Sequence, residues 1–228
     1  ETEIDQLEKT SLMVGELMTS PVITVNVNDS LGAATAKMIR NKLKRMPVID
    51  ENGRLAGMIS RLDILEQVVE SGHSSTPQPL PEGTVRTIGD VMTSKLPAVN
   101  QNTDLVGIVE IFTESGSTHL IVTDDMGKAI GLISDSDVVA RIQPEKQAGI
   151  LAALKNRGNP PGGHETAFDL MSRGVLTAPP STPVVTAARM MLEKSRKWLV
   201  VVNDAGDPVG LVDRQILLES VASVYHID

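Results

Sequence analysis

Apolar and polar residues follow a pattern that recurs three times along the chain. Each copy contains a short β-branched stretch, then a segment with apolar residues three and four apart. Two further apolar stretches follow, separated by a polar turn, and an amphipathic segment closes the copy. Spacing of three and four predicts a helix, and short β-branched stretches bounded by turn residues predict strands. Each copy is therefore predicted to fold as β-α-β-β-α.

The first copy illustrates these elements. Strands are expected over residues 22–25 ("VITV"), 45–50 ("RMPVID") and 55–60 ("LAGMIS"), the last two joined by the turn "ENGR", whose Asn-Gly pair is typical of hairpins. A helix is expected within residues 28–43, after Asp and Ser residues suited to capping. A closing helix over residues 61–70 is expected to be capped by Ser60.

The copies align at two separate landmarks, which makes chance similarity improbable. Both sets of landmarks are separated by 74 and then 79 residues. The corresponding residues are Met18, Met92 and Met171 in one set and Gly57, Gly131 and Gly210 in the other. Repeats are expected over residues 14–70, 87–142 and 166–223. The linker 71–86, rich in Ser, Pro and Gly, is expected to be exposed, and the linker 143–165 to contain a further helix in "PEKQAGILAALKN".

One such repeat is too small to bury its sheet well, so pairing is expected. If the first and second repeats pair within the chain, the third presents an unpaired sheet face. A homodimer in which the third repeats meet is then expected, or a missing fourth partner. Because the sequence begins at Glu1, it is also expected to be part of something larger.

Composition narrows the class of protein. The 228 residues include no cysteine, which excludes disulfides, thiolate catalysis and Cys-type zinc sites and fits a cytoplasmic location. The net charge of −8 and the 2% of aromatic residues argue against nucleic-acid binding. No apolar run reaches the roughly 18 residues of a membrane span, so direct insertion is not expected. Hydrolase, phosphate-loop and metalloprotease motifs are absent from the sequence and its four histidines are scattered, so neither catalytic residues nor a metal site is predicted.

The repeats resemble CBS domains, the cystathionine-β-synthase-type modules. The resemblance rests on "ELMTSPVITV", "DSLGAATAKM", "RMPVIDENGRLAGMIS" and "SRLD", with their equivalents in the later copies. It implies an α+β (α/β) fold of three β-α-β-β-α repeats, the first two paired through their sheets as a Bateman module. It also implies that adenosine nucleotides bind in clefts between paired repeats and regulate an attached or partner enzyme, channel or transporter.

A Ser-x-x-Asp motif follows the third strand in two repeats, as Ser60 with Asp63 and Ser134 with Asp137. The strand's end places a hydroxyl and free backbone N–H groups at a helix N-terminus, which suits a phosphate. An Asp three residues later can accept both hydroxyls of a ribose. By resemblance these four residues would contact ribose and phosphate. Ser-x-x-Asp is equally a helix-capping pattern, so both interpretations stay open.

Other contacts are implied by the resemblance alone. Lys44, Arg45, Thr118 and His119 would supply side chains to phosphates, and the backbone around Ile23 and Pro97 would bind adenine. Their alternatives are a solvated strand end and ordinary core positions. In the third repeat the solvated interpretation is preferred for the pair Arg196 and Lys197, and Trp198 is assigned to the core.

The third repeat departs from the motif, since Asp213 replaces the serine and Ile216 the aspartate. No ordinary nucleotide site is therefore expected from that repeat. Two functions remain for the chain. The first is a regulatory module that senses AMP, ADP or ATP, and the second is a ligand-free structural or oligomerisation module in which Ser60 and Ser134 only cap helices.

Overall fold

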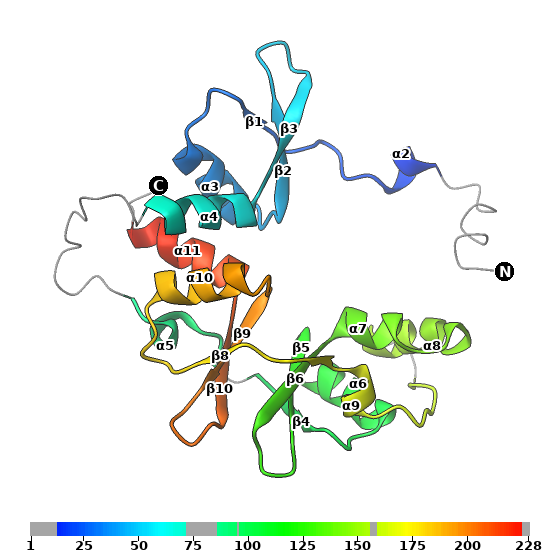
Figure 1. Ribbon diagram of the computed structural model, residues 1–228. Coiled ribbons are helices and arrows are strands. Elements are labelled where there is room, and N and C mark those ends of the chain that lie inside the picture. Colours follow the sequence, from blue (N-terminus) through cyan, green and yellow to red (C-terminus); the bar gives the residue numbers. More distant parts are fainter. Residues whose placement is uncertain (1–12, 72–85, 95, 156–158, 225–228) are drawn as a thin grey trace.

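A computed structural model describes residues 13–71, 86–94, 96–155 and 159–224 of this chain (Figure 1). Repeat 1 consists of a short helix, a three-stranded sheet and two longer helices. Its elements are α2 (Val14–Leu17), β1 (Val25–Asn26), α3 (Leu31–Arg40), β2 (Arg45–Ile49), β3 (Leu55–Ser60) and α4 (Arg61–Ser71). The central strand β2 is parallel to β1 and antiparallel to β3.

Repeats 2 and 3 have the same order of elements. Repeat 2 contains α5 (Ile88–Val91), β4 (Ala98–Asn100), α6 (Leu105–Ser115), β5 (His119–Thr123), β6 (Ala129–Ser134) and α7 (Asp135–Ala140). The added helix α8 (Pro144–Leu154) packs on α6 and α7. Repeat 3 contains α9 (Ala167–Leu170), β7 (Ser172–Arg173), β8 (Thr177–Ala178), α10 (Val184–Glu193), β9 (Trp198–Val202), β10 (Pro208–Asp213) and α11 (Arg214–Val224).

Local sequence explains where these elements begin and turn. Ser30 caps α3, because its Oγ accepts a hydrogen bond of 3.1 Å from the backbone N–H of Ala33. Asp104 caps α6 in the same way through Gly107. The hairpin turn between β2 and β3 places Gly53 at φ 74°, a left-handed conformation that glycine adopts without strain. The α+β fold with three β-α-β-β-α repeats is confirmed.

The sheets of repeats 2 and 3 pack against each other. Ile121 and Leu132 of repeat 2 meet Val200 and Leu211 of repeat 3 in a buried cluster. The segment at the start of each repeat crosses to the other sheet: β7 of repeat 3 pairs with β6 of repeat 2. Reciprocally, Thr93 of repeat 2 exchanges backbone hydrogen bonds of 2.9 and 3.1 Å with Leu211 of repeat 3. The two repeats therefore form a pair with approximate twofold symmetry.

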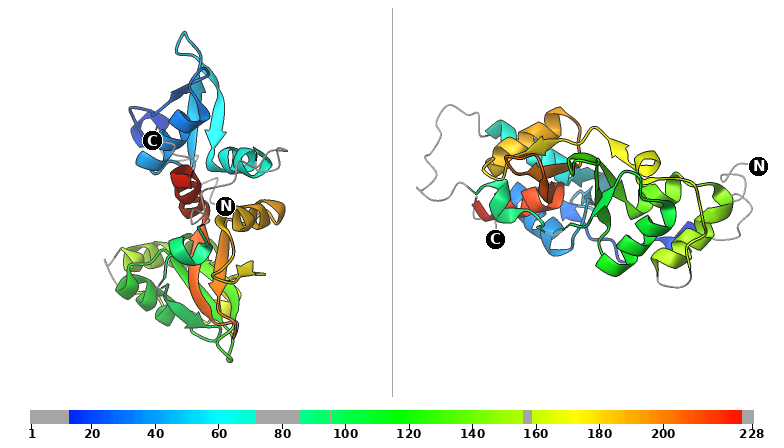
Figure 2. Two further views of the ribbon diagram at one scale, coloured as in Figure 1. Left: turned by 90° about the vertical axis from the view of Figure 1, so that its left-hand side faces the viewer. Right: turned by 90° about the horizontal axis from the view of Figure 1, so that it is seen from below.

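Repeat 1 packs on repeat 3 through helices instead of sheets. Helices α3 and α4 contact α10 and α11, and Ile64 and Leu65 share one buried core with Leu217 and Leu218. In Figure 1 and the side view of Figure 2, these helices lie between the sheet of repeat 1 and the paired sheets. The sheet of repeat 1 leaves one face open, with Leu55 and Met58 exposed.

This arrangement corrects the expected pairing. Repeat 2 pairs its sheet with repeat 3, whereas the sequence interpretation paired repeat 1 with repeat 2. The unpaired sheet accordingly belongs to repeat 1, not to repeat 3. All three repeats carry apolar residues and a glycine on the equivalent face, so composition alone does not distinguish the partners.

None of the helices in the described part of the chain is long and apolar enough to cross a membrane.

Candidate functional site

The three strand-to-helix junctions, where β3 meets α4, β6 meets α7 and β10 meets α11, converge on one cavity. Its volume is about 620 Å³, within the range typical of small-ligand sites. We call it the central cavity. Each repeat supplies five of its lining residues: Lys44, Arg45, Ser60, Arg61 and Leu62; Thr118, His119, Ser134, Asp135 and Ser136; Lys197, Trp198, Asp213, Arg214 and Gln215.

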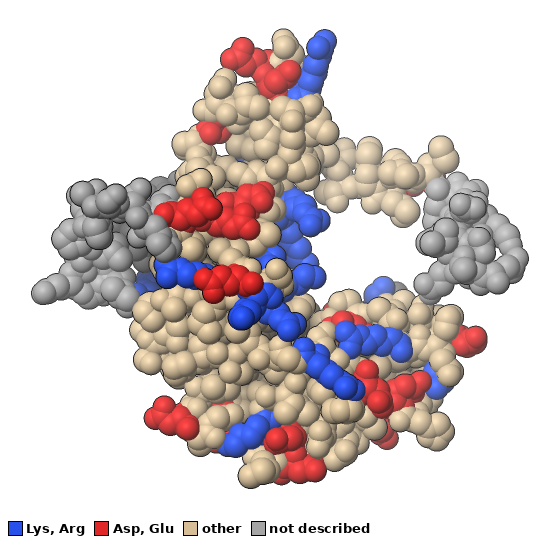
Figure 3. All heavy atoms as spheres, viewed as in Figure 1, with Lys and Arg blue, Asp and Glu red and all other residues tan. Residues whose placement is uncertain are grey.

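The central cavity is basic although the chain is acidic. Its lining carries five Lys and Arg side chains and only two carboxylates, those of Asp135 and Asp213, whereas the whole chain has a net charge of −8. Figure 3 shows Lys and Arg side chains gathered on one face where repeat 1 meets the other two repeats. Clustering of one sign of charge in a concave site attracts ligands of the opposite sign, so the cavity is suited to an anion.

Two of the cavity's arginines have structural partners. The guanidinium of Arg61 donates to the backbone oxygens of Leu43 (2.7 Å) and Lys42 (2.9 Å), just after α3 ends. Burial lowers the pKa of Arg61, while Asp213 and Glu219 act in the opposite direction. Arg214 donates through Nη2 to the backbone oxygen of Arg196 (3.1 Å). The buried Nε of Arg214 has no hydrogen-bond partner within the described part of the chain.

The other cations of the cavity are less committed. Over the described ranges, Lys44 and Arg45 form neither an ion pair nor a side-chain hydrogen bond. Lys197 places its Nζ 5.8 Å from the centroid of the Trp198 ring. A cation left without a carboxylate partner at a concave surface can bind an anionic ligand without first breaking an ion pair.

His119 and Trp198 face each other in the repeat 2–repeat 3 pair. They occupy equivalent positions, opposite Ser134 and Asp213 respectively, and their ring centroids lie 5.1 Å apart at 59°. Burial lowers the pKa of His119; Asp135, Asp213 and Asp137 oppose this and Lys44 adds to it. The lowered pKa favours the neutral imidazole.

Trp198 packs against the buried cluster between repeats 2 and 3, as expected of a core residue, but its alignment is corrected. It is equivalent to His119 and Arg45, not to the buried Leu120 and Met46, and it lines the central cavity. Lys197 is exposed at the start of the strand, as expected, and it also lines this cavity. The sequence alignment was one residue out of register here, because "RKWLVVV" lacks a landmark that fixes where the strand begins.

Both Ser-x-x-Asp motifs act as helix caps. In repeat 2, the backbone N–H of Ser134 donates to Asp137 Oδ2 (3.0 Å), and the backbone N–H of Asp137 donates to Ser134 Oγ (3.1 Å). In repeat 1, the backbone N–H of Ser60 donates to Asp63 Oδ2 (2.8 Å), and the reciprocal distance is 3.4 Å. The capping interpretation therefore has a geometric basis in both repeats, and each cap uses one oxygen of its carboxylate.

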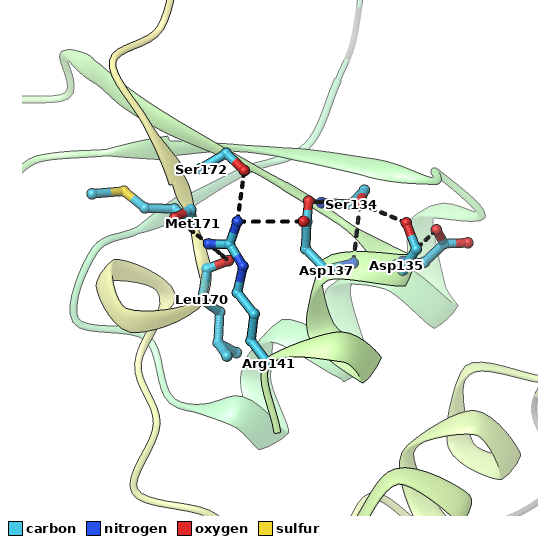
Figure 4. A network of polar contacts seen from close by, with 8 residues as sticks. Ser134, Asp135, Asp137, Arg141, Leu170, Met171 and Ser172 are labelled. Carbon is cyan, nitrogen blue, oxygen red and sulfur yellow. Dashed lines mark hydrogen bonds and ion pairs between the residues drawn. The ribbon is translucent and has the colours of Figure 1, made fainter. Parts of the chain in front are cut away.

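Arg141 links the repeat 2 motif to repeat 3 (Figure 4). Its Nη2 lies 3.5 Å from Asp137 Oδ1 and 2.9 Å from Ser172 Oγ. Its Nη1 donates to the backbone oxygens of Leu170 (3.0 Å) and Met171 (2.5 Å). A ligand group that displaced Asp137 from Arg141 would therefore also affect the segment of repeat 3 that Arg141 contacts, residues 170–172.

Six of the ten expected site residues line the central cavity: Lys44, Arg45, Ser60, Thr118, His119 and Ser134. Asp63 and Asp137 lie on the first turns of α4 and α7, where they accept hydrogen bonds from the backbone N–H groups of the two serines. Ile23 and Pro97 do not line the cavity. Ile23 packs against the core of repeats 1 and 3, and the Pro97 oxygen already accepts from the N–H of Ile121 (3.1 Å).

Sequence reasoning missed the contribution of repeat 3. Lys197, Trp198 and Arg214 line the cavity. No binding role is predicted for this repeat from its sequence, because it lacks the Ser-x-x-Asp motif. Asp213 caps α11 by accepting from the backbone N–H groups of Gln215 (2.8 Å) and Ile216 (2.9 Å). The available signal was the positive charge of Lys197 directly before the second strand, in the place of Lys44. Over the residues that the structure describes, His, Asp and Glu side chains form no cluster able to hold a metal ion.

The family model of the CBS domain matches residues 14–70, 88–144 and 167–223. This chain belongs to the CBS domain family, whose members are generally regulatory and not catalytic.

Relatives of the chain include proteins with and without assigned roles. An uncharacterized protein of Methanocaldococcus jannaschii is 26% identical over 210 residues, which are 91% of this chain and 43% of that protein. The gamma-3 subunit of 5′-AMP-activated protein kinase from Sus scrofa is 23% identical over 88% of this chain and 38% of its own length. The chain thus spans less than half of either relative. An uncharacterized conserved protein from Pyrococcus horikoshii has the same fold, with a TM-score of 0.62, 23% identity, and coverage of 90% of this chain and 81% of that one.

Proposed function

We propose that this chain is a ligand-sensing regulatory module that binds an adenosine nucleotide (AMP, ADP or ATP) and holds its phosphates in the central cavity. The observation that carries the proposal is the uncompensated positive charge of Lys44, Arg45 and Lys197 where three helix N-termini converge. Helix N-termini and free cations both favour phosphate. Binding there would alter an attached domain or a partner enzyme, channel or transporter.

The adenosine part of the proposal has two supports. The first is the Ser-x-x-Asp motif, because the carboxylates of Asp63 and Asp137 still have lone pairs for ribose hydroxyls after capping. The backbone around Ile23 and Pro97 is proposed to bind adenine. The second is a relative that is a subunit of a kinase named for activation by 5′-AMP. A nucleotide spanning two or three repeats could regulate only by binding one arrangement of the repeats more tightly than another.

A ligand-free structural or oligomerisation module is the second candidate function. The reciprocal caps of Ser60 with Asp63 and Ser134 with Asp137 favour it, because they give all four residues a role without a ligand. The basic cavity is not explained in this way, because clustered cations without carboxylate partners repel one another, which opposes folding.

A thermal titration separates the two. AMP, ADP, ATP and tripolyphosphate are added to the purified chain, and melting is followed by the fluorescence of its single tryptophan. A ligand at about 100 times its Kd stabilises by about 2.7 kcal/mol, which raises the Tm of a chain of this size by about 5–10 °C. No shift with any adenosine nucleotide would overturn the proposal in favour of the structural module.

Charge-removing variants then locate the site. Lys44→Ala and Arg45→Ala are each expected to raise the Kd for the nucleotide about 10- to 100-fold, the range for losing one hydrogen bond to a charged group. Arg54→Ala is the matched control, because Arg54 is an exposed arginine of the same repeat that does not line the cavity. Equal loss of affinity in all three variants would place binding elsewhere.

A further inference from the structure

Repeat 1 exposes the apolar surface that repeats 2 and 3 bury against each other. Met58 is 55% exposed, whereas its equivalents Leu132 and Leu211 are 4% and 5% exposed. Leu17 is 72% exposed, and its equivalent in repeat 3, Leu170, is 1% exposed. We call this surface the open face; it comprises Val14, Leu17, Met18, Val22, Leu55 and Met58, each more than half exposed. These six residues lie on two parts of repeat 1, the sheet and the segment around α2, and exposed apolar side chains whose equivalents are buried mark an interaction site.

Within the described part of the chain, the open face also has a glycine, Gly57, that no methionine covers. In the repeat 2–repeat 3 pair, each crossing methionine lies on a glycine of the other repeat. A Cβ added to Gly131 would lie 2.8 Å from Met171 Cβ, and one added to Gly210 would lie 2.9 Å from Met92 Cγ. Among the described residues, no atom lies within 4 Å of a Cβ added to the equivalent Gly57. Its own repeat supplies the equivalent methionine, Met18, on a segment that extends away from the body (Figure 1).

We propose that a second copy of this chain covers the open face, so that two repeats 1 pair through their sheets as repeats 2 and 3 do. Met18 of each copy would lie on Gly57 of the other, and Thr19 would pair with Met58 as Thr93 pairs with Leu211. The result is a twofold dimer with repeat 1 at its centre and the repeat 2–repeat 3 pairs at its ends.

The observations favour a second copy over an unrelated partner. Repeat 1 carries both complementary parts, the crossing segment and the glycine. A twofold axis would therefore place the crossing segment of each copy on the glycine of the other. Repeat 2 of the same chain cannot serve, because its sheet is already buried on repeat 3. Helices α3 and α4 face repeat 3, which leaves the sheet directed outward (Figure 2). The pairing would bring together two Arg45 side chains, equivalents of His119 and Trp198, so moderate salt is expected to tighten association by screening.

Light scattering on the intact chain tests the proposal. In moderate salt the protein is expected to have twice the 24.4 kDa mass of one chain. Met58→Asp places a charge on the open face and is expected to give a monomer without loss of folding, since Met58 is exposed within one chain. Met126→Asp is the matched control, a methionine 80% exposed on the β5–β6 hairpin, and should leave the dimer intact. A monomeric wild type, or a dimer unaffected by Met58→Asp, would overturn the proposal.

Disulfide trapping tests the geometry, because the chain has no cysteine of its own. Met18→Cys and Gly57→Cys proteins are mixed and oxidised. A covalent dimer is expected from the mixture, because the two Cβ atoms would lie close enough for a disulfide. A mixture of Met18→Cys with Met126→Cys is the control and should not cross-link. Equal cross-linking in the two mixtures, or none in the first, would exclude this arrangement. Absence of cross-linking in the first mixture is also the result expected if another CBS protein occupies the open face. Neither experiment depends on a nucleotide, so their failure would leave the proposed function untouched.

Discussion

At the residue scale, one pair of side chains can serve both the fold and a ligand. Ser134 and Asp137 cap α7 reciprocally, and Ser134 also lines the central cavity. In repeat 3 the same junction is capped by Asp213 alone. A cap therefore needs only one acceptor at this place. Retention of both Ser and Asp in repeats 1 and 2 is consistent with a second role, which substitutions can separate from capping.

Substitution of Asp137 separates the two roles. Asp137→Asn retains an oxygen that accepts from the Ser134 N–H, so stability should fall by less than about 1 kcal/mol, whereas Asp137→Ala removes the acceptor and should cost about 0.5–2 kcal/mol. Both variants lose the negative charge, and both are expected to bind the nucleotide about 10-fold more weakly. Urea unfolding and calorimetric titration measure the two effects. Full affinity in Asp137→Asn would assign the residue to capping alone.

His119 makes stability depend on pH. Its pKa is lowered from 6.5, chiefly by burial, so the unfolded chain binds a proton that the folded chain resists. Stability from this group is present above pH 6.5 and is lost as the pH falls below that value. The advantage of the wild type over His119→Gln in urea unfolding should therefore shrink from pH 7.5 to 5.5. Bound tripolyphosphate should reduce the slope, because a nearby anion favours the imidazolium. A difference independent of pH would contradict the burial of a neutral His119.

At the element scale, the β-α-β-β-α order was predictable because each element has a local signal. Ser30 and Asp104 cap helices, and the hairpin glycine fixes a turn. The pairing of sheets was not predictable, because it depends on how a methionine from one repeat fits over a glycine of another. Met18, Met92 and Met171 look alike in sequence, and only the packed structure distinguishes the two that are engaged from the one that is free.

The glycine positions give a direct measure of that pairing. Gly131→Ala would force Met171 from its place and is expected to destabilise the chain by about 1–3 kcal/mol, as for other overpacked sites. Gly57→Ala is the matched control and should change stability by less than about 0.5 kcal/mol, since no atom of the described residues lies within 4 Å of the added carbon. Both are measured by urea unfolding in a Met58→Asp background, so that association does not contribute. Equal effects would show that the two faces have the same environment.

At the scale of the whole molecule, the central cavity belongs to no single repeat. Lys44, His119 and Lys197 come from three repeats and line one space. The sequence indicated six residues of repeats 1 and 2 that line the cavity, because strand ends and helix starts are local features. It could not indicate that repeat 3 completes the cavity, because that follows from the packing of α3 and α4 on α10 and α11. A ligand held there would link the helical interface to the paired sheets.

A shared ligand predicts a shared response in hydrogen exchange. Saturating ATP is expected to slow amide exchange together at the starts of α4, α7 and α11, because all three junctions line the same cavity. At one fixed ATP concentration, Lys197→Ala in repeat 3 should reduce the protection at the start of α4 in repeat 1. Loss of one contact lowers the affinity for ATP, so every junction that contacts the ligand is occupied less often. Lys194→Ala is the matched control, because this exposed lysine follows α10 and lies outside the cavity lining. Protection confined to one repeat, or an effect of Lys197→Ala limited to α11, would show that the repeats bind ligand separately, and coupling through the central cavity would then be wrong.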